Sequence, residues 1–302
     1  MEQRAVTVQV DGAVLAGTAV IPEQPRGIAV LISGSGPIDR NSDAKRLALH
    51  VMGLLATTLA EAGWASLRYD KRGVGDSGGD YWTAGLHDGI ADARRAAAHA
   101  RTLVEGPVVV IGHSEGAVIA ADLASDPGLV DGVVLLAGMA GTGEQTLRYQ
   151  ARVLEPQVPS VVRTLMRLLG TSVTKQQDKQ LATLASSTRD TYRVQLVARI
   201  NAKWFREFLV HDAGAALAAA RVPMLAITGG KDTQVDPGDL AVMARIAGER
   251  LTAELVPDVD HILRHEPKPV SSPRGYRRQA GKPLDPRVTD LVAGWLSSLD
   301  QR

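Results

Sequence analysis

Short apolar segments alternate with longer helical patterns along this chain, and this alternation constrains its fold more than any other feature. GIAVLIS (27–33) and PVVVIGHS (107–114) are almost continuously apolar, as expected for strands that are buried on both faces. Near the start, Asp11-Gly12 joins two such segments and indicates a tight hairpin turn. Strands that alternate with helices predict an α/β fold, with a mostly parallel sheet covered on both faces.

The pattern predicts eight strands and a long insertion. The predicted strands are 5–10, 13–21, 27–33, 64–70, 107–114, 130–138, 222–230 and 251–257. The predicted helices flanking them are 44–62, 84–104, 115–125, 237–248 and 286–299. Residues 140–215 break this rhythm, because they are richer in Gln, Arg, Lys and Thr and are helical in pattern throughout. We therefore predict a core formed by 1–139 and 216–302, with a helical cap (lid) at 140–215 inserted after the sixth strand.

The composition excludes several classes of protein. The 302 residues are 45% hydrophobic and 22% charged, which is typical of a globular protein. The net charge of +1 gives no field for nucleic acid or an anionic membrane, so we expect neither as a partner. With no cysteine, a disulfide, a thiolate nucleophile or a Cys-ligated metal is excluded. The sequence shows no signal peptide and no apolar run of about 18 residues, so we expect a cytoplasmic protein without membrane insertion.

Two segments match the pattern G-x-S-x-G, and at most one of their serines is expected to be a nucleophile. Gly75-Asp76-Ser77-Gly78-Gly79 is identical to the nucleophile segment of trypsin-like serine proteases, but it lies in a glycine-rich stretch without a preceding strand. Ser114, in GHSEG, follows the apolar run 108–111 and precedes an amphipathic helix, the context that an α/β nucleophile needs. Its flanking glycines, Gly112 and Gly116, suit positions where side chains would collide. We predict Ser114 as the nucleophile and Ser77 as a loop residue.

Partners for Ser114 are expected in the order acid, then histidine, each just after a strand. Asp232 follows the strand at 222–228, and His261 follows the strand at 251–257. Asp236 is an alternative acid, although its Asp-Pro context is typical of a helix start. His265 and His211 are alternative bases.

The oxyanion hole is expected to combine two backbone amides. One is the N–H of Glu115, directly after the nucleophile, and the other comes from the loop SGSGPIDRN after the third strand. Gly34 and Gly36 allow this loop to turn its amides inward, and Ser35 is the preferred donor with Gly36 as the second choice. The glycines fit a plain strand-to-helix turn equally well. No metal or organic cofactor is required by this chemistry.

Taken together, these residues resemble the α/β-hydrolase superfamily, and most closely bacterial acyl esterases of the serine aminopeptidase-like Hydrolase_4 type. The residues that carry the resemblance are LISGSGPIDRN (31–41), RYDKRGVGDS (68–77), GHSEG (112–116), GGKDTQV (229–235) and DHILR (260–264). It implies Ser114, Asp232 and His261 as a triad, with the Ser35 and Glu115 amides as oxyanion hole. It also implies that Asp70, Arg72 and Ser77 brace the site from the loop after the fourth strand.

The expected activity is hydrolysis of carboxylic esters with small to medium acyl chains through an acyl-enzyme, with a small-molecule ester as substrate. An aminopeptidase or thioesterase with the same triad, and a non-catalytic ligand-binding protein on the same fold, are the alternatives. An aminopeptidase would need a carboxylate for the substrate ammonium, and Glu144 or Glu207 could supply it. A homodimer is an open alternative for the assembly.

The surroundings of the pocket leave two questions open. Met139, Leu147, Leu165 and Met166 could line the acyl pocket or simply pack the cap on the core. The segment 264–286 carries six Lys or Arg residues against two acids. It is either a solvated loop or a lid edge that recognises an anionic group.

Overall fold

A single eight-stranded sheet organises the computed structural model, which describes residues 2–158, 160, 166, 168, 172–194, 198–272 and 275–299. Its strands are β1 (Glu2–Val10), β2 (Ala13–Ile21), β3 (Ile28–Ile32), β6 (Ala65–Tyr69), β7 (Val108–His113), β8 (Gly132–Leu136), β11 (Met224–Gly229) and β12 (Leu251–Val256). They lie in the order β1-β2-β6-β3-β7-β8-β11-β12, in which β2 is antiparallel to both neighbours and the remaining pairs are parallel. The predicted fold class is confirmed.

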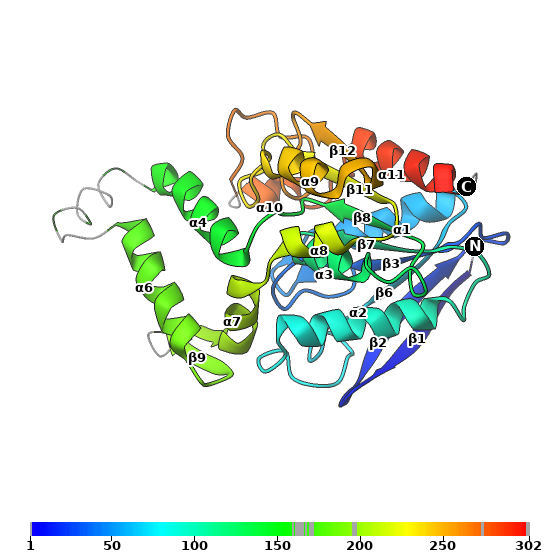
Figure 1. Ribbon diagram of the computed structural model, residues 1–302, viewed down its shortest axis with the longest axis horizontal. Helices are drawn as coiled ribbons and strands as arrows, with labels where there is room; N and C mark the ends of the chain where they lie inside the picture. The colour runs from blue at the N-terminus through cyan, green and yellow to red at the C-terminus, as the bar shows by residue number, and fades with distance from the viewer. Residues whose placement is uncertain are drawn as a thin grey trace.

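Helices cover both faces of the sheet, because the side chains of each central strand point alternately to opposite sides. In β3, Ile28, Val30 and Ile32 join one buried cluster, whereas Ala29 and Leu31 join the other. The first cluster lies beneath α2 (Leu86–Ala100), α3 (Glu115–Leu123), α8 (Ala213–Ala219) and α9 (Asp239–Ala247), and the second beneath α1 (Val51–Glu61) and α11 (Pro286–Leu299) (Figure 1). A short helix, α10 (Tyr276–Gln279), precedes α11.

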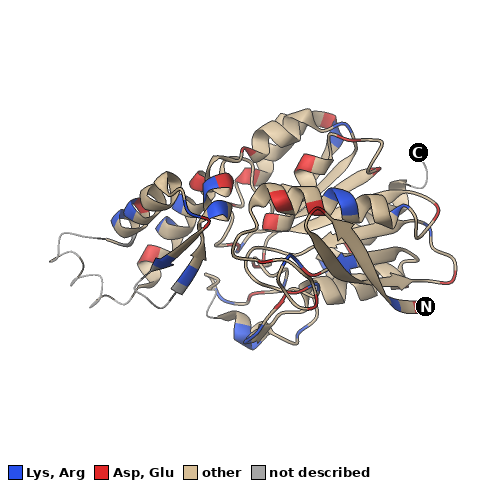
Figure 2. Cartoon of the chain, turned by 90° about the horizontal axis from the view of Figure 1, so that it is seen from below, with Lys and Arg blue, Asp and Glu red and all other residues tan. Residues whose placement is uncertain are grey.

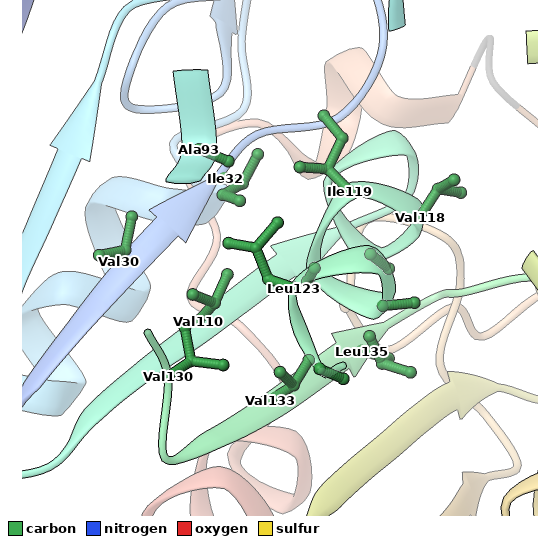
Figure 3. Packing of buried hydrophobic residues seen from close by; sticks show 14 of the residues in the cluster. Val30, Ile32, Ala93, Val110, Val118, Ile119, Leu123, Val130, Val133 and Leu135 are labelled. Atoms are coloured by element: carbon green, nitrogen blue, oxygen red, sulfur yellow. The ribbon is translucent and has the colours of Figure 1, made fainter. Parts of the chain in front are cut away.

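Aliphatic packing fixes α3 to the sheet. Figure 3 shows Ile119 and Leu123 of α3 facing Ile32 and Val110 of the two central strands. All four side chains are nearly or fully buried, and burial of each contributes about 1.5–3 kcal/mol. The first residue of α3 is therefore held rigidly beside the end of β7, which is where Ser114 lies.

The described elements between residues 140 and 210, called the cap segment below, project from the sheet on the side opposite the two chain termini (Figure 1). They are α4 (Gly143–Leu154), the 3-10 helix η1 (Glu155–Gln157), α6 (Val173–Ser186), β9 (Thr191–Val194), β10 (Ala198–Asn201) and α7 (Ala202–Val210). Both signs of charge occur on the cap segment (Figure 2). In the part of the chain that the structure describes, none of the helices is long and apolar enough to span a membrane.

Two details differ from the sequence prediction. The cap is not helical throughout, because β9 and β10 form an antiparallel hairpin. The helix expected from residue 44 begins at Val51, since 43–48 form the two-residue strands β4 (Asp43–Ala44) and β5 (Leu47–Ala48). The carboxylates of Asp39 and Asp43 cause this, because they accept the backbone N–H groups of residues 41, 43 and 50 and hold the chain in a turn.

Candidate active site

Ser114 occupies a strained turn between β7 and α3. Its φ of 58° and ψ of −116° are rare for a residue with a side chain. A Cβ on Gly112 would lie 1.9 Å from the carbonyl oxygen of Gly116, and a Cβ on Gly116 would lie 2.1 Å from that of Ile32. Glycine is therefore required at both positions, because only its bare backbone permits so close an approach.

The three side chains expected to form a triad are in hydrogen-bond contact. His261 Nε2 lies 3.1 Å from Ser114 Oγ, and His261 Nδ1 lies 2.7 Å from Asp232 Oδ2. Asp232 follows β11 and His261 follows β12. The other oxygen of Asp232 accepts the amides of Gln234 and Val235 at 2.7 and 3.0 Å. The carboxylate is thus oriented by its own loop, and the imidazole is held between it and the hydroxyl.

The alternative candidates are engaged elsewhere. Asp236 accepts the amide of Gly238 at the start of α9, and His211 Nε2 lies 3.0 Å from Asp122. His265 pairs its backbone with Val259 in an isolated bridge. The structure gives none of the three a hydrogen bond to Ser114 or His261 within the described residues.

Two buried groups hold the loop that carries His261. Asp260 Oδ1 accepts the backbone amides of Ile262 and Arg264 at 3.1 and 3.2 Å, and burial raises the pKa of Asp260 to about 6. His113 Nε2 lies 2.7 Å from the backbone oxygen of His261. Burial, and next the nearby His261, lower the pKa of His113 to about 4, so His113 is neutral and donates this bond. His113, the residue before Ser114, therefore positions the loop that carries His261.

The residues expected to form the oxyanion hole line one cavity. Ser35, Gly36, Ser114 and Glu115 all line it. Glu115 is the first residue of α3, so its N–H has no acceptor within the helix. Gly36 has a φ of +95°, and a Cβ on Gly34 would lie 3.3 Å from the Ser114 Cβ. The glycines thus let the loop turn tightly against Ser114.

Lys71, whose role no sequence motif indicated, ties this loop to the turn at Ser114. Its Nζ donates to the Gly34 oxygen at 2.5 Å and to Glu115 Oε2 at 2.7 Å. The C=O of Gly34 and the N–H of Ser35 belong to one planar trans peptide and point in opposite directions. Because Lys71 holds the carbonyl oxygen, it also fixes the direction of the Ser35 amide.

Trp204 of α7 joins the cap segment to the same cluster. Its indole Nε1 donates to Glu115 Oε1 at 2.5 Å, so both carboxylate oxygens of Glu115 are bonded. Glu115 is buried, and its charge is balanced by Lys71. The residue after Ser114 consequently contacts the oxyanion loop through Lys71 and the cap through Trp204.

The loop after β6 braces the site from the side. Arg72 makes two bonds to Asp92 of α2, at 2.8 and 2.7 Å, and Asp70 pairs with Arg40 at 2.5 Å. Ser77 Oγ donates to the Asp70 backbone oxygen at 2.7 Å and accepts the amide of Ala16 at 2.9 Å. The prediction that Ser77 is a loop residue is confirmed, because its hydroxyl is used by backbone groups.

The cavity beside Ser114 has a volume of about 390 Å³ and lies between the core and the cap segment. Met139 and Leu147 line it as expected, whereas Met166 is not part of its lining; Leu165 lies outside the described residues. Among the described residues that line it, Glu115 is the one carboxylate. Glu144 instead pairs with Arg148, and Glu207 accepts the amide of His87. No group of three or more His, Asp or Glu side chains in the described ranges could hold a metal ion.

The segment 264–286 is anchored to the core by a few buried residues, whereas more than half of its described residues are exposed. Arg264 is 1% exposed and donates to the backbone oxygens of Leu49 and Lys282 at 2.6 and 3.0 Å. Tyr276 and Gln279 are buried as well. Within its described part, none of the residues lines the cavity. Lys268, Arg277, Arg278 and Lys282 are exposed, which agrees with a solvated surface, and no described contact supports the reading as an anion-binding lid edge.

Comparison with known proteins establishes the family. A family model described as serine aminopeptidase, S33, matches residues 49–268, which is more than half of the chain. The chain belongs to the Hydrolase_4 family. The resemblance inferred from the motifs is thus confirmed.

Individual relatives of this Hydrolase_4 chain include esterases. Esterase EstD of Thermotoga maritima is 26% identical over 289 residues, which are 93% of this chain and 65% of EstD. The chain therefore spans just under two thirds of the length of that curated relative. Est1E of Butyrivibrio proteoclasticus, in a structure with ferulic acid bound, superimposes with a TM-score of 0.66 at 15% identity, covering 99% of this chain and 100% of Est1E. The Pyrococcus furiosus esterase Pf2001 superimposes with a TM-score of 0.63 at 16% identity, covering 98% of this chain and 91% of Pf2001. These likenesses show a shared α/β-hydrolase fold.

Proposed function

We propose that this chain is a carboxylesterase that works through an acyl-enzyme. The observation that carries the proposal is the continuous hydrogen-bonded series from Ser114 through His261 to Asp232, located at a cavity that the Ser35 and Glu115 residues also line. Membership of the Hydrolase_4 family and the likeness to EstD support an esterase-type hydrolase.

In the proposed mechanism each group has one step. His261 takes the proton of Ser114 as Oγ attacks the ester carbonyl, and Asp232 stabilises the imidazolium that forms. The amides of Ser35 and Glu115 donate to the oxygen that becomes negative. His261 then protonates the departing alcohol. Water, activated by the same imidazole, attacks the acyl-enzyme and releases the acid.

The cavity favours an ester over a peptide with a free amino terminus. An aminopeptidase needs a carboxylate that is available to the substrate ammonium. Glu115 already binds Lys71 and Trp204, and Glu144 and Glu207 lie outside the described lining. The volume of about 390 Å³ lies at the lower end of small-molecule sites and suits acyl groups of small to medium size.

The test is a comparison of p-nitrophenyl esters of increasing acyl length with aminoacyl-arylamides and a butanoyl thioester. Wild type and Ser77→Ala are expected to hydrolyse the esters, whereas Ser114→Ala should lose at least about 10⁴-fold in kcat. Ser77 is a matched control, because it is a serine in the same pattern that contacts loop backbone instead of a histidine. Ester hydrolysis that survives in Ser114→Ala would refute the mechanism. Faster turnover of the arylamide or the thioester would replace the carboxylesterase by the corresponding alternative.

A further inference from the structure

Aromatic residues are scarce in this chain but concentrated at the proposed site. The chain has four Trp, five Tyr and two Phe, and five of these eleven line the cavity beside Ser114. They are Tyr81, Trp82, Trp204, Phe205 and Phe208. The buried residues of the core are mostly Ala, Val, Leu and Ile, so the aromatic lining of the cavity differs from the rest of the interior. The cavity therefore departs from the composition of the molecule at the place where a substrate would bind.

Three of these rings form a wall on α7. Trp204 and Phe208 are four residues apart and so share one face of the helix, where they stack at 4.6 Å with planes 13° apart. Phe205 meets Trp204 edge-on at 5.0 Å and 87°. These rings already pack on one another in the stacked and edge-on geometries that aromatic rings prefer, so a further ring in the cavity could pack on them in the same way.

The remaining two rings lie on the loop after β6. Tyr81 and Trp82 meet edge-on at 5.3 Å. Asn201 Nδ2 donates to the Tyr81 backbone oxygen at 2.6 Å, and the Arg199 guanidinium lies 5.2 Å from the Trp82 ring centre. Residues at the end of the cap hairpin therefore hold this second group of rings in place.

The position of Trp204 is fixed relative to the reacting groups. Its indole N–H is bonded to Glu115, whose backbone amide is a proposed oxyanion donor. A ring that lies against Trp204 is thus set at a defined distance from Ser114. Such preorganisation favours binding, because little side-chain freedom is lost when the substrate binds.

We propose that the cavity selects esters that carry an aromatic ring near the scissile carbonyl, and that Trp204 is the specificity-determining residue. This inference rests on the proposed ester hydrolysis. The likeness to Est1E is one of fold, so the ring site follows from the cavity lining of this chain alone. An aromatic pair adds an interaction worth about 2- to 12-fold in an equilibrium or rate constant beyond the area buried.

The decisive experiment compares substrates that differ in aromaticity but share a carbon skeleton. Methyl 3-phenylpropanoate against methyl 3-cyclohexylpropanoate tests the acyl side, and 2-phenylethyl acetate against 2-cyclohexylethyl acetate tests the alcohol side. We expect the phenyl ester of one pair to have a kcat/KM about 5-fold higher, and that pair identifies the side that the wall holds. Equal values, or a cyclohexyl preference in both pairs, would overturn the proposal.

Variants assign the preference to Trp204. Trp204→Leu should abolish it and Trp204→Phe, which keeps a ring, should retain most of it. Tyr192→Leu is the matched control, because Tyr192 is a partly exposed aromatic residue of the cap hairpin outside the cavity lining. Phe205→Leu, expected to weaken the preference, is a second variant should Trp204→Leu not fold. A phenyl preference that persists unchanged in both leucine variants would refute the assignment.

A binding measurement separates this inference from the proposed function. Ser114→Ala protein should bind 3-phenylpropanoate about 5-fold more tightly than 3-cyclohexylpropanoate, measured by calorimetry. If none of the four esters is hydrolysed but this binding preference holds, the ring site stands and the esterase proposal fails. If the esters are hydrolysed and the two acids bind equally, with equal kcat/KM within each pair, the esterase stands and the ring site fails.

Discussion

Replacing Lys71 by methionine should reduce catalysis and stability for two separate reasons. The methionine keeps an unbranched apolar stem but removes the ammonium that holds the Gly34 oxygen and the Glu115 carboxylate. The Gly34–Ser35 peptide then becomes free to rotate, and Glu115 retains only the Trp204 indole as a partner.

The two effects have different sizes. Deleting one oxyanion donor outright typically costs about 10²- to 10³-fold in kcat, and a donor that is loosened rather than deleted should cost about 10- to 100-fold. Leaving a buried carboxylate without its cation costs up to about 3–5 kcal/mol. Glu115 keeps one hydrogen bond, so we expect about 3 kcal/mol of lost unfolding free energy.

The assay combines steady-state kinetics on a short-chain p-nitrophenyl ester with urea unfolding. In Lys71→Met, kcat should fall while KM changes little, because the amide acts mainly on the charged transition state. Adding Glu115→Gln removes the unpaired charge, so the double variant should regain stability but not kcat. Arg101→Met, which removes a cation that pairs with Asp131 on the surface and outside the cavity lining, is the control for a generic loss of charge.

One outcome would refute this reasoning directly. If folded Lys71→Met keeps kcat within about 2-fold of wild type, Lys71 does not orient the Ser35 amide. If the double variant regains kcat together with stability, the loss came from disturbed folding rather than from the position of the amide.

Three further predictions concern the acid, the glycines and the pH dependence. Asp232→Asn should lose about 10⁴-fold in kcat without a large change in KM, since the imidazole loses its orientation and its counter-charge; a loss below about 10-fold in steady-state kinetics would contradict the role of this carboxylate. Gly112→Ala should lower the unfolding free energy by more than about 3 kcal/mol in urea unfolding, because its Cβ would lie 1.9 Å from a carbonyl oxygen. Gly294→Ala, inside α11 with open space around it, should instead raise it by about 0.5–1 kcal/mol, and equal effects of the two variants would contradict the crowding argument. Between pH 6.5 and 4, His113 binds a proton in the unfolded chain but not in the folded one, so a fall in pH lowers the unfolding free energy by about 3 kcal/mol. Over the same range Asp260 binds a proton in the folded chain but not in the unfolded one, which raises the unfolding free energy by a similar amount. Stability in this window should therefore decrease with falling pH in Asp260→Asn and increase in His113→Gln, and unfolding curves between pH 4 and 7 that do not diverge between the two variants would show that these groups do not titrate as described.

The features that the sequence predicted well are those determined by neighbouring residues. The apolar runs at 28–32 and 108–111 predict central strands, because successive side chains of a strand point to opposite faces of the sheet and both faces are buried only in its centre. The nucleophile turn was visible because its two glycines and the serine lie within five residues. Likewise, Asp232 and His261 are predicted from their positions directly after strands, and their side chains are in hydrogen-bond contact.

The features that were missed depend on contacts between distant residues. Lys71 and Glu115 are 44 positions apart, and no local pattern indicates that they meet. The start of α1 depends on carboxylates that fold the preceding segment into a turn. The hairpin had a local signal, because TYRV at 191–194 is rich in residues that favour strands, but the helical pattern around it obscured this preference. The aromatic cavity likewise has no local signal, because its rings come from α7 and from the loop after β6, which are far apart in the sequence.

The hydrogen bonds and the ion pair between the cap segment and the core divide the cap into two parts, whose sequences are constrained to different degrees. Asn201 holds the backbone at residues 81 and 84, Lys203 pairs with Asp88 at 2.6 Å, and Glu207 accepts the amide of His87. The stretch from β10 to α7 is therefore expected to evolve together with residues 81–88, because a substitution in one of the two segments would break contacts unless the other changed as well. The helices α4 and α6 contact α7 but are joined to the core by fewer bonds, such as that of Gln150 to the Gln234 backbone. Recombination with a relative across α4 and α6 would exchange one side of the cavity while leaving the indole and its carboxylate partner together.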